Sequence, residues 1–143
     1  MRARVADVAA LSEYYPAIKS AHVALVLTSG CLFALRGLLR IAGSEAGNGR
    51  PVRLLSAAID TLLLVGGVSL IFVLRLNPAT TAWLATKLLL LVAYIVLGSL
   101  ALRRARTSGR RALAFAAALA CFASMYAIAR AHDATAPLRW LGL

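Results

Sequence analysis

Four long hydrophobic stretches, separated by short polar segments, make up most of the chain. They cover about residues 19–41, 54–74, 81–102 and 111–131. Each is about twenty residues long or slightly more, which is the length an α-helix needs to cross a hydrocarbon core of about 30 Å. The stretches are continuous and rich in leucine and alanine, without the alternation of transmembrane β-strands. The pattern therefore predicts four transmembrane helices.

The connections between the predicted helices are short. Residues 42–53 contain three glycines, a proline and two arginines, residues 75–80 include an Asn-Pro turn, and residues 103–111 contain five arginines. Short connections make helices that follow each other in sequence antiparallel neighbours. We expect an all-α integral membrane protein in which residues 1–143 form a single domain, a four-helix up-down transmembrane bundle.

Composition supports a membrane location. The 143 residues are 62% hydrophobic, and the mean hydropathy of +0.83 is too high for a soluble domain of this size. The net charge is +11, but the basic residues bracket the apolar stretches, as in a bacterial inner-membrane protein. The basic-aromatic pattern of a nucleic-acid-binding module is absent from the sequence. We expect the lipid bilayer as a partner and no nucleic acid.

Basic residues are distributed unequally between the two ends of the predicted bundle. Nine arginines lie in the first and third loops or just before the first: Arg36, Arg40, Arg50, Arg53, Arg103, Arg104, Arg106, Arg110 and Arg111. The other end has six basic residues, of which Arg2 and Arg4 lie near the N-terminus. The positive-inside rule predicts cytoplasmic first and third loops and periplasmic termini. Residues 1–13 lack the apolar core of a cleavable signal peptide.

The first predicted helix has a polar stripe. His22, Ser29 and Arg36 follow at steps of seven residues, close to two helical turns, and Lys19 extends the stripe by one turn. Ionisable side chains at membrane depth persist where they face other helices, water or a ligand. The stripe therefore predicts that the interior of the helix bundle contains polar side chains.

Two pairs of ionisable residues are expected at matching depths. Arg36 and Asp60 should meet near the inner face as a structural ion pair between two helices, with a proton or quinone role as the alternative. His22 and Lys87 should lie together near the outer face, where two cations would repel each other and a neutral imidazole is favoured. A neutral His22 could ligate a metal or could simply pack between helices, so both interpretations stay open. Tyr94 lies one heptad after Lys87.

An ordered set of residues carries a family resemblance from Tyr14 onward. The set is Tyr15, Ile18-Lys19, His22, Leu35-Arg36-Gly37, Ile59-Asp60-Thr61-Leu62-Leu63-Leu64, Gly67, Trp83, Lys87, Tyr94, Gly98 and Ala101-Leu102-Arg103. In this set the chain resembles the SirB family of bacterial inner-membrane proteins. The chain has Ser56-Ala57 where many members of the family have a Pro-His pair, and it therefore lacks a second histidine in addition to His22 at membrane depth.

A second resemblance concerns a cofactor. Tyrosine, lysine and His22 in the first helix, with Trp83 and Lys87 in the third, are similar to the HemJ-type protoporphyrinogen oxidases, which are small haem-associated membrane proteins. This similarity implies a haem b or porphyrin site. His22 would be an axial ligand, and Lys87 would pair with a propionate or ligate the iron. Lys19 and Tyr94 are the further candidate cofactor-binding residues.

We interpret the chain as a SirB-like inner-membrane protein, a small membrane component or accessory subunit and not a defined enzyme. Helix faces rich in alanine, leucine and glycine would suit a homodimer or a larger membrane complex. One alternative is a redox protein that binds haem b through His22 and Lys87. Another is a metal-handling or transport protein. The sequence contains no HExxH, paired CxxC, phosphate-binding glycine loop or nucleophile elbow.

Overall fold

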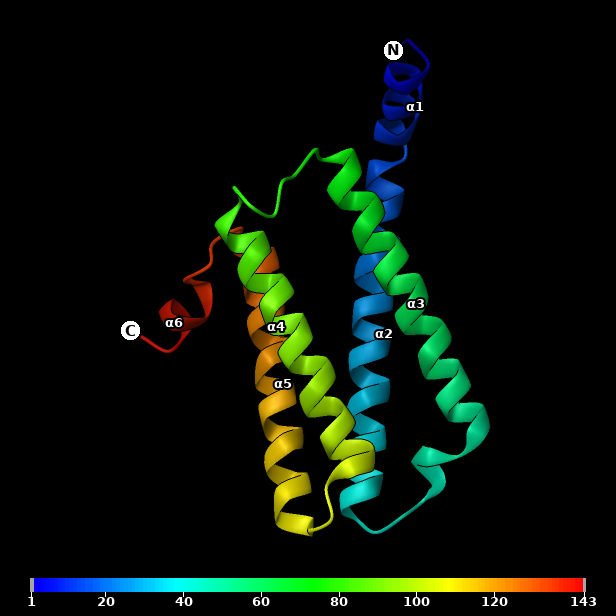
Figure 1. Ribbon diagram of the computed structural model, residues 1–143, viewed down its shortest axis with the longest axis vertical. Helices are drawn as coiled ribbons and strands as arrows, with labels where there is room; N and C mark the ends of the chain where they lie inside the picture. The colour runs from blue at the N-terminus through cyan, green and yellow to red at the C-terminus, as the bar shows by residue number, and fades with distance from the viewer. Residues whose placement is uncertain (1, 143) are drawn as a thin grey trace. The chain divides into compact units, whose positions relative to one another are not determined.

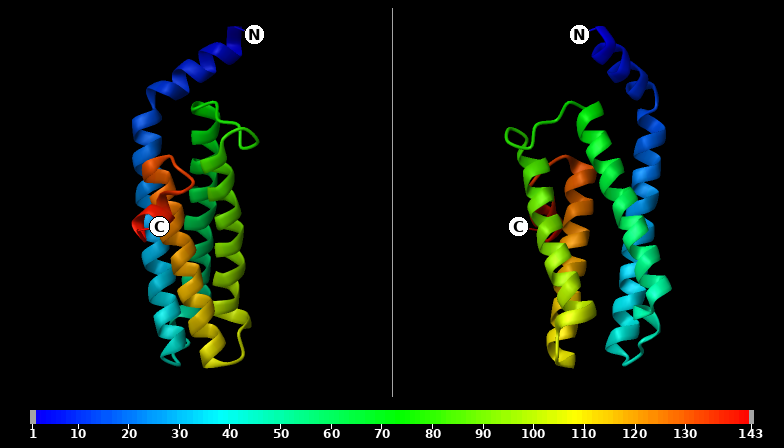
Figure 2. Two further views of the ribbon diagram at one scale, coloured as in Figure 1. Left: turned by 90° about the vertical axis from the view of Figure 1, so that its left-hand side faces the viewer. Right: turned by 45° about the vertical axis from the view of Figure 1, so that its right-hand side comes forward.

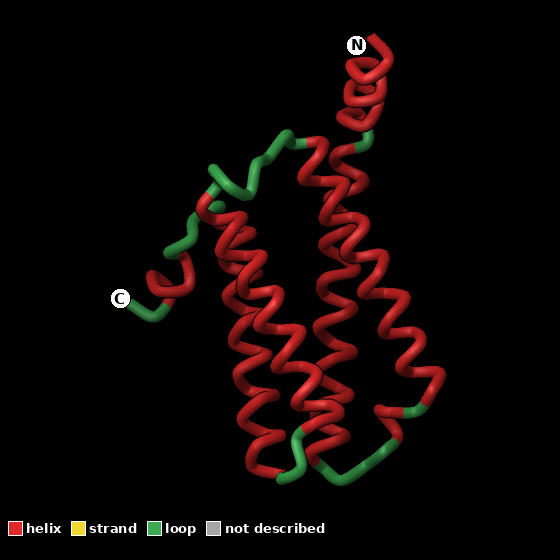
Figure 3. The backbone as a smooth tube through the Cα atoms, viewed as in Figure 1, coloured by secondary structure: helices red, strands yellow, loops and turns green. Residues whose placement is uncertain are grey.

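The computed structural model describes residues 2–142, apart from the side chains of residues 8, 11 and 12. In this range every regular element is a helix (Figures 1 and 3). In chain order the elements are α1 (Arg2–Glu13), α2 (Tyr15–Ile41), the 3₁₀-helix η1 (Ala46–Asn48), α3 (Arg50–Val73), α4 (Ala82–Ser99), the π-helix η2 (Leu100–Arg104), α5 (Ser108–Ala131) and α6 (Ala136–Trp140).

Four of the helical segments are long and apolar enough to cross a membrane. They are Tyr15–Ile41, Arg50–Val73, Ala82–Arg104 and Ser108–Ala131. The predicted all-α class and the four spanning helices are therefore confirmed, and the chain is a multi-pass membrane protein. The first two spanning helices, α2 and α3, begin four residues before the predicted apolar stretches, because backbone hydrogen bonding continues into the flanking polar residues.

The chain forms two compact units, and α2 contributes to both. Unit 1 contains Met1–Leu32 and Arg50–Asn77, and unit 2 contains Phe33–Gly49 and Pro78–Leu143. Each unit is described by itself below. The single bundle of all four helices stays a prediction.

In unit 1, α2 and α3 are antiparallel. His22 lies beside Gly66 and Gly67, whereas Ser29, later in α2, bonds Asp60, which comes earlier in α3. The reversed order of these contacts follows from the short connection between the two helices. Pro51 lies in the first turn of α3, where the missing N–H of proline has no cost.

Unit 2 is built on an antiparallel hairpin of α4 and α5, which lie side by side (Figure 2). The end of α2 packs against both helices through Phe33, whose ring centroid is 5.2 Å from that of Tyr94 and 5.6 Å from that of Phe115. Gly98 permits this approach, because a Cβ there would lie 3.2 Å from the Phe33 ring. The buried residues of this core are Phe33, Ala101, Leu102, Ala114, Phe115 and Ala118.

Candidate functional site

Two polar assemblies contain most of the buried or membrane-depth polar side chains singled out by the sequence. The first is in unit 1 and comprises His22, Ser29, Asp60, Gly66 and Gly67; we call it the α2–α3 seam. The second is in unit 2 at the end of α2 and comprises Arg36, Arg40, Glu45, Asn48 and Arg111; we call it the arginine clasp.

In the α2–α3 seam the imidazole of His22 lies directly on the backbone of α3. A Cβ placed on Gly66 would lie 3.4 Å from His22 Nδ1, and a Cβ on Gly67 would lie 3.3 Å from His22 Cε1. The Gly67 distance is tighter than most real Cβ contacts, and the Gly66 distance is at the short end of ordinary van der Waals contact. The two glycines therefore provide the space that the imidazole fills, so His22 packs against α3 here. Its role as a cofactor ligand stays a prediction.

One heptad further along the seam, Ser29 Oγ donates a hydrogen bond of 2.6 Å to Asp60 Oδ1. Asp60 lies near the middle of α3, a membrane-spanning helix, and its side chain is exposed. A carboxylate has room for several hydrogen bonds, and Ser29 is its one donor among the described residues. The seam thus presents an acidic group that is only partly satisfied at membrane depth.

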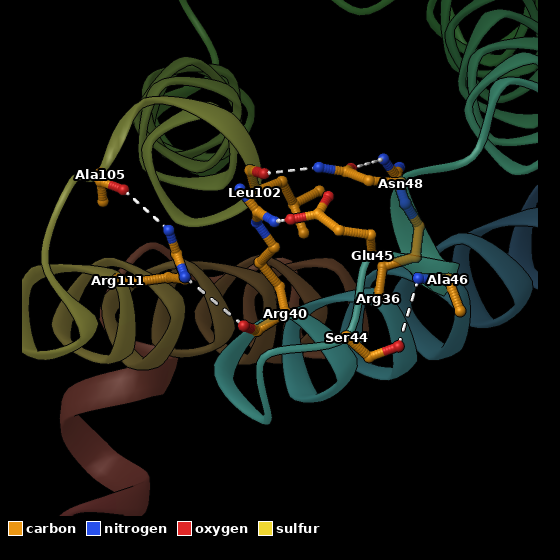
Figure 4. Close-up of polar contacts among 9 residues, drawn as sticks. All are labelled: Arg36, Arg40, Ser44, Glu45, Ala46, Asn48, Leu102, Ala105 and Arg111. Atoms are coloured by element: carbon orange, nitrogen blue, oxygen red, sulfur yellow. Dashed lines mark hydrogen bonds and ion pairs between the residues drawn. The ribbon is translucent and has the colours of Figure 1, made fainter.

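The arginine clasp (Figure 4) closes the loop after α2 onto the end of α4. Arg36, which is only 7% exposed, donates from Nε to the Gly47 carbonyl at 2.7 Å and from Nη2 to Asn48 Oδ1 at 3.2 Å. Asn48 Nδ2 in turn donates to the Leu102 carbonyl at 3.0 Å. Leu102 is in the last turn before the α4–α5 connection, where backbone carbonyls have no partner within the helix. Asn48 therefore caps that end.

Two more arginines complete the clasp. Arg40 forms an ion pair with Glu45. Arg111, at the start of α5, donates from Nη2 to the Ala105 carbonyl at 3.0 Å and from Nη1 to the Arg40 carbonyl at a longer 3.5 Å. Arg40 lies in the last turn of α2, and Ala105 directly follows η2. The aligned peptide dipoles of a helix favour a cation at its C-terminal end. One guanidinium therefore joins three parts of unit 2, which are the end of α2, the α4–α5 connection and the start of α5.

Arg36 and Asp60, the expected structural ion pair, each have another partner in the structure. Arg36 binds Gly47 and Asn48 in unit 2, and Asp60 accepts the hydroxyl of Ser29 in unit 1. A direct Arg36–Asp60 ion pair stays a prediction. Asn48 was not predicted from the sequence as part of this site. Its position between Gly47 and Gly49, in a loop beside a helix end, was the available signal.

The four expected cofactor-binding residues are divided between the units. Lys19 and His22 belong to unit 1, where Lys19 is exposed and its Nζ lies 6.0 Å from the Tyr15 ring centroid. Lys87 and Tyr94 belong to unit 2, where the Tyr94 ring packs between those of Phe33 and Phe122. A haem site that combines these residues stays a prediction. Among the described residues, no three His, Cys, Asp or Glu side chains gather as a metal site.

Comparison with known proteins assigns the family. The profile of the family described as "Invasion gene expression up-regulator, SirB" matches residues 15–134. The chain belongs to the SirB family. The match takes in all four spanning helices of this SirB-family protein, and therefore both the α2–α3 seam and the arginine clasp. Helix α1 lies outside it.

Individual relatives agree with this assignment. Protein SirB2 of Salmonella typhimurium strain LT2 is 39% identical over 102 residues, which are 68% of this chain and 79% of the relative, and Protein SirB2 of Salmonella typhi has the same values. Protein YchQ of Escherichia coli strain K12 is 33% identical over 109 residues, or 73% of this chain and 84% of the relative. No solved structure matches the chain at a significant level.

Proposed function

We propose that this SirB-family protein is a small accessory subunit of a complex in the bacterial inner membrane, and that it binds its partner along α3. The partner is another membrane-spanning helix, from a second copy of the chain or from another protein. The observation that carries the proposal is the exposed carboxylate of Asp60 in the middle of a spanning helix.

Helix α3, all of whose residues the structure describes, contains no buried residue. Its large apolar side chains Leu54, Leu55, Leu62, Leu64, Val65 and Phe72 are each more than half exposed. Lipid tails alone would satisfy such a surface. A carboxylate is different, because ionisable groups inside membranes almost always face other helices, water or a paired group. Asp60 therefore supports a polar partner on this helix.

Location and topology complete the proposal. The relatives come from Salmonella and Escherichia coli, and the arginine excess in the first and third loops supports cytoplasmic loops and periplasmic termini in the inner membrane. The family description refers to gene expression. For a chain built of membrane-spanning helices, we propose that any such effect passes through a bound partner and not through contact with nucleic acid.

The test compares two variants of α3 in membranes of a producing bacterium, extracted directly into polymer-bounded nanodiscs. Wild-type protein should migrate as a complex larger than a monomer. Asp60→Leu should insert at least as well, because it removes a charge, yet should migrate as the monomer. Thr61→Val is the matched control, because the Thr61 hydroxyl bonds the Ala57 carbonyl of its own helix. Monomeric wild-type protein, or an intact complex in Asp60→Leu, would contradict the proposal.

A further inference from the structure

Four arginines around the α4–α5 connection have side chains that bind no other part of the described chain. Arg103, Arg104, Arg106 and Arg110 are exposed, and within residues 2–142 none of them has a hydrogen bond or ion pair through its side chain. We call these four residues the basic turn. They contrast with Arg36, Arg40 and Arg111 of the arginine clasp, whose guanidinium groups all bind protein atoms.

The basic turn is short and held in place. Only residues 105–107 separate η2 from α5. Arg111 Nη2 binds the Ala105 carbonyl across the connection, and Thr107 Oγ1 accepts the Arg110 backbone N–H at 3.3 Å as the cap of α5. The four exposed arginines therefore lie on two helix ends and the short connection between them, and not on a flexible tail, so little backbone entropy is lost on binding.

The basic turn also lies where lipid headgroups are. The two spanning segments on either side of it are Ala82–Arg104 and Ser108–Ala131, so the turn connects them at one surface of the membrane. Glu45 is the one carboxylate among residues 33–49 and 100–111, and it pairs with Arg40. The positive charge of the basic turn therefore has no compensating acid in the clasp region.

We propose that the basic turn binds the phosphate groups of anionic phospholipids at the membrane surface, with phosphatidylglycerol as the model ligand. The planar guanidinium group donates two parallel hydrogen bonds to a phosphate, a geometry that the ammonium group of lysine does not match. Clusters of four or more basic residues directly beside a spanning helix attract anionic headgroups in this way. This surface is independent of α3 and of the partner proposed there.

Spin-labelled lipids measure the preference directly. The full chain is reconstituted in phosphatidylcholine vesicles with a trace of spin-labelled phosphatidylglycerol or of spin-labelled phosphatidylcholine. The fraction of immobilised label gives the relative affinity of each lipid for the protein surface. Wild-type protein should prefer phosphatidylglycerol, and high salt should reduce that preference because the groups involved are exposed.

Two variants of equal net charge distinguish lipid binding by the basic turn from a general effect of the total charge of the protein. A variant with glutamine at Arg103, Arg104, Arg106 and Arg110 should lose the preference while keeping the wild-type melting temperature. The control replaces four other exposed arginines, Arg2, Arg4, Arg75 and Arg130, with glutamine and should retain it. A preference that survives the first variant, that falls equally in both, or that is insensitive to salt in wild-type protein would overturn the proposal.

Discussion

Glycines set how closely the helices of this protein approach one another. In unit 1, Gly66 and Gly67 admit the imidazole of His22, and in unit 2, Gly98 admits the ring of Phe33. Small residues at such positions are typical of membrane helices, because packing and not water exclusion holds these helices together.

Gly37→Ala should destabilise unit 2. A Cβ at Gly37 would collide with the ring of Phe115, which is buried and cannot move away freely. Overpacking of this kind costs about 1–3 kcal/mol. Thermal unfolding in detergent measures the loss. Gly109→Ala is the control, because a Cβ there meets nothing within 4 Å and should be neutral or slightly stabilising. Recovery of stability in Gly37→Ala with Phe115→Leu would confirm the collision; equal stability of the two single variants would refute it.

His22→Ala should lower the melting temperature, because it empties the space opposite Gly66 and Gly67. Protein produced with ample haem should be colourless if packing is the whole role of His22. Optical spectroscopy of the purified protein decides between this role and the haem hypothesis. A Soret band in wild-type protein that disappears in His22→Ala would establish the ligand role instead.

Side chains close the ends of several helices, and these contacts explain how the loops are ordered. Asn48 and Arg111 supply donors to carbonyls at or beyond the ends of α2 and η2. Beyond α5, Asp133 accepts the backbone N–H and the hydroxyl of Thr135 and pairs with Arg139 of α6. In each case a polar side chain replaces the hydrogen bonds that the helix itself cannot provide.

Asn48→Ala should cost about 1–3 kcal/mol of stability, since it leaves both Arg36 Nη2 and the Leu102 carbonyl without this partner. Chemical denaturation in mixed micelles gives the difference. Ser44→Ala, in the same loop, removes only an exposed hydrogen bond to the Ala46 N–H and should have a much smaller effect. Similar losses in both variants would show that Asn48 does not hold the loop to α4.

Acid should release α6 only at low pH. The backbone N–H of Thr135, then its hydroxyl and Arg139, hold the pKa of Asp133 below its usual range. The stabilisation is therefore complete above the unfolded pKa of about 3.9 and is lost as the pH falls through the lower folded value. In a Trp83→Phe background, the fluorescence of Trp140 should stay constant from neutral pH to about pH 4 and change below it. An acid transition that persists in Asp133→Asn would have another origin.

For the molecule as a whole, the distribution of arginines predicts the orientation in the membrane. Alkaline phosphatase fused after the C-terminus should be active, because a periplasmic terminus places it in the compartment where it folds. The same enzyme fused at Arg106 should be inactive. The reverse pattern would place the basic turn in the periplasm and would show that Arg2 and Arg4 dominate insertion.

The sequence predicted elements better than polar partners. Apolar stretches of spanning length located four helices, because each helix buries its own surface in lipid. Matching depths along straight helices predicted Asp60 as the partner of Arg36, and that ion pair stays a prediction. The Gly47 carbonyl and Asn48, which the loop after α2 places beside Arg36, were not predicted. The π-helix at the end of α4 was also not predicted, because one extra residue in a turn leaves no periodic signal.

The amino-acid sequence by itself determined the family, the number of spanning helices, their approximate ends and the excess of arginine in the first and third loops. The helices and their ends are properties of single segments, since hydropathy and length decide insertion helix by helix. The tertiary structure alone decided that His22 packs on two glycines, that Ser29 bonds Asp60, and that Asn48 joins Arg36 to Leu102. Hydrogen bonds and close packing depend on differences of a few tenths of an ångström between atoms far apart in sequence, and only the folded chain sets those distances.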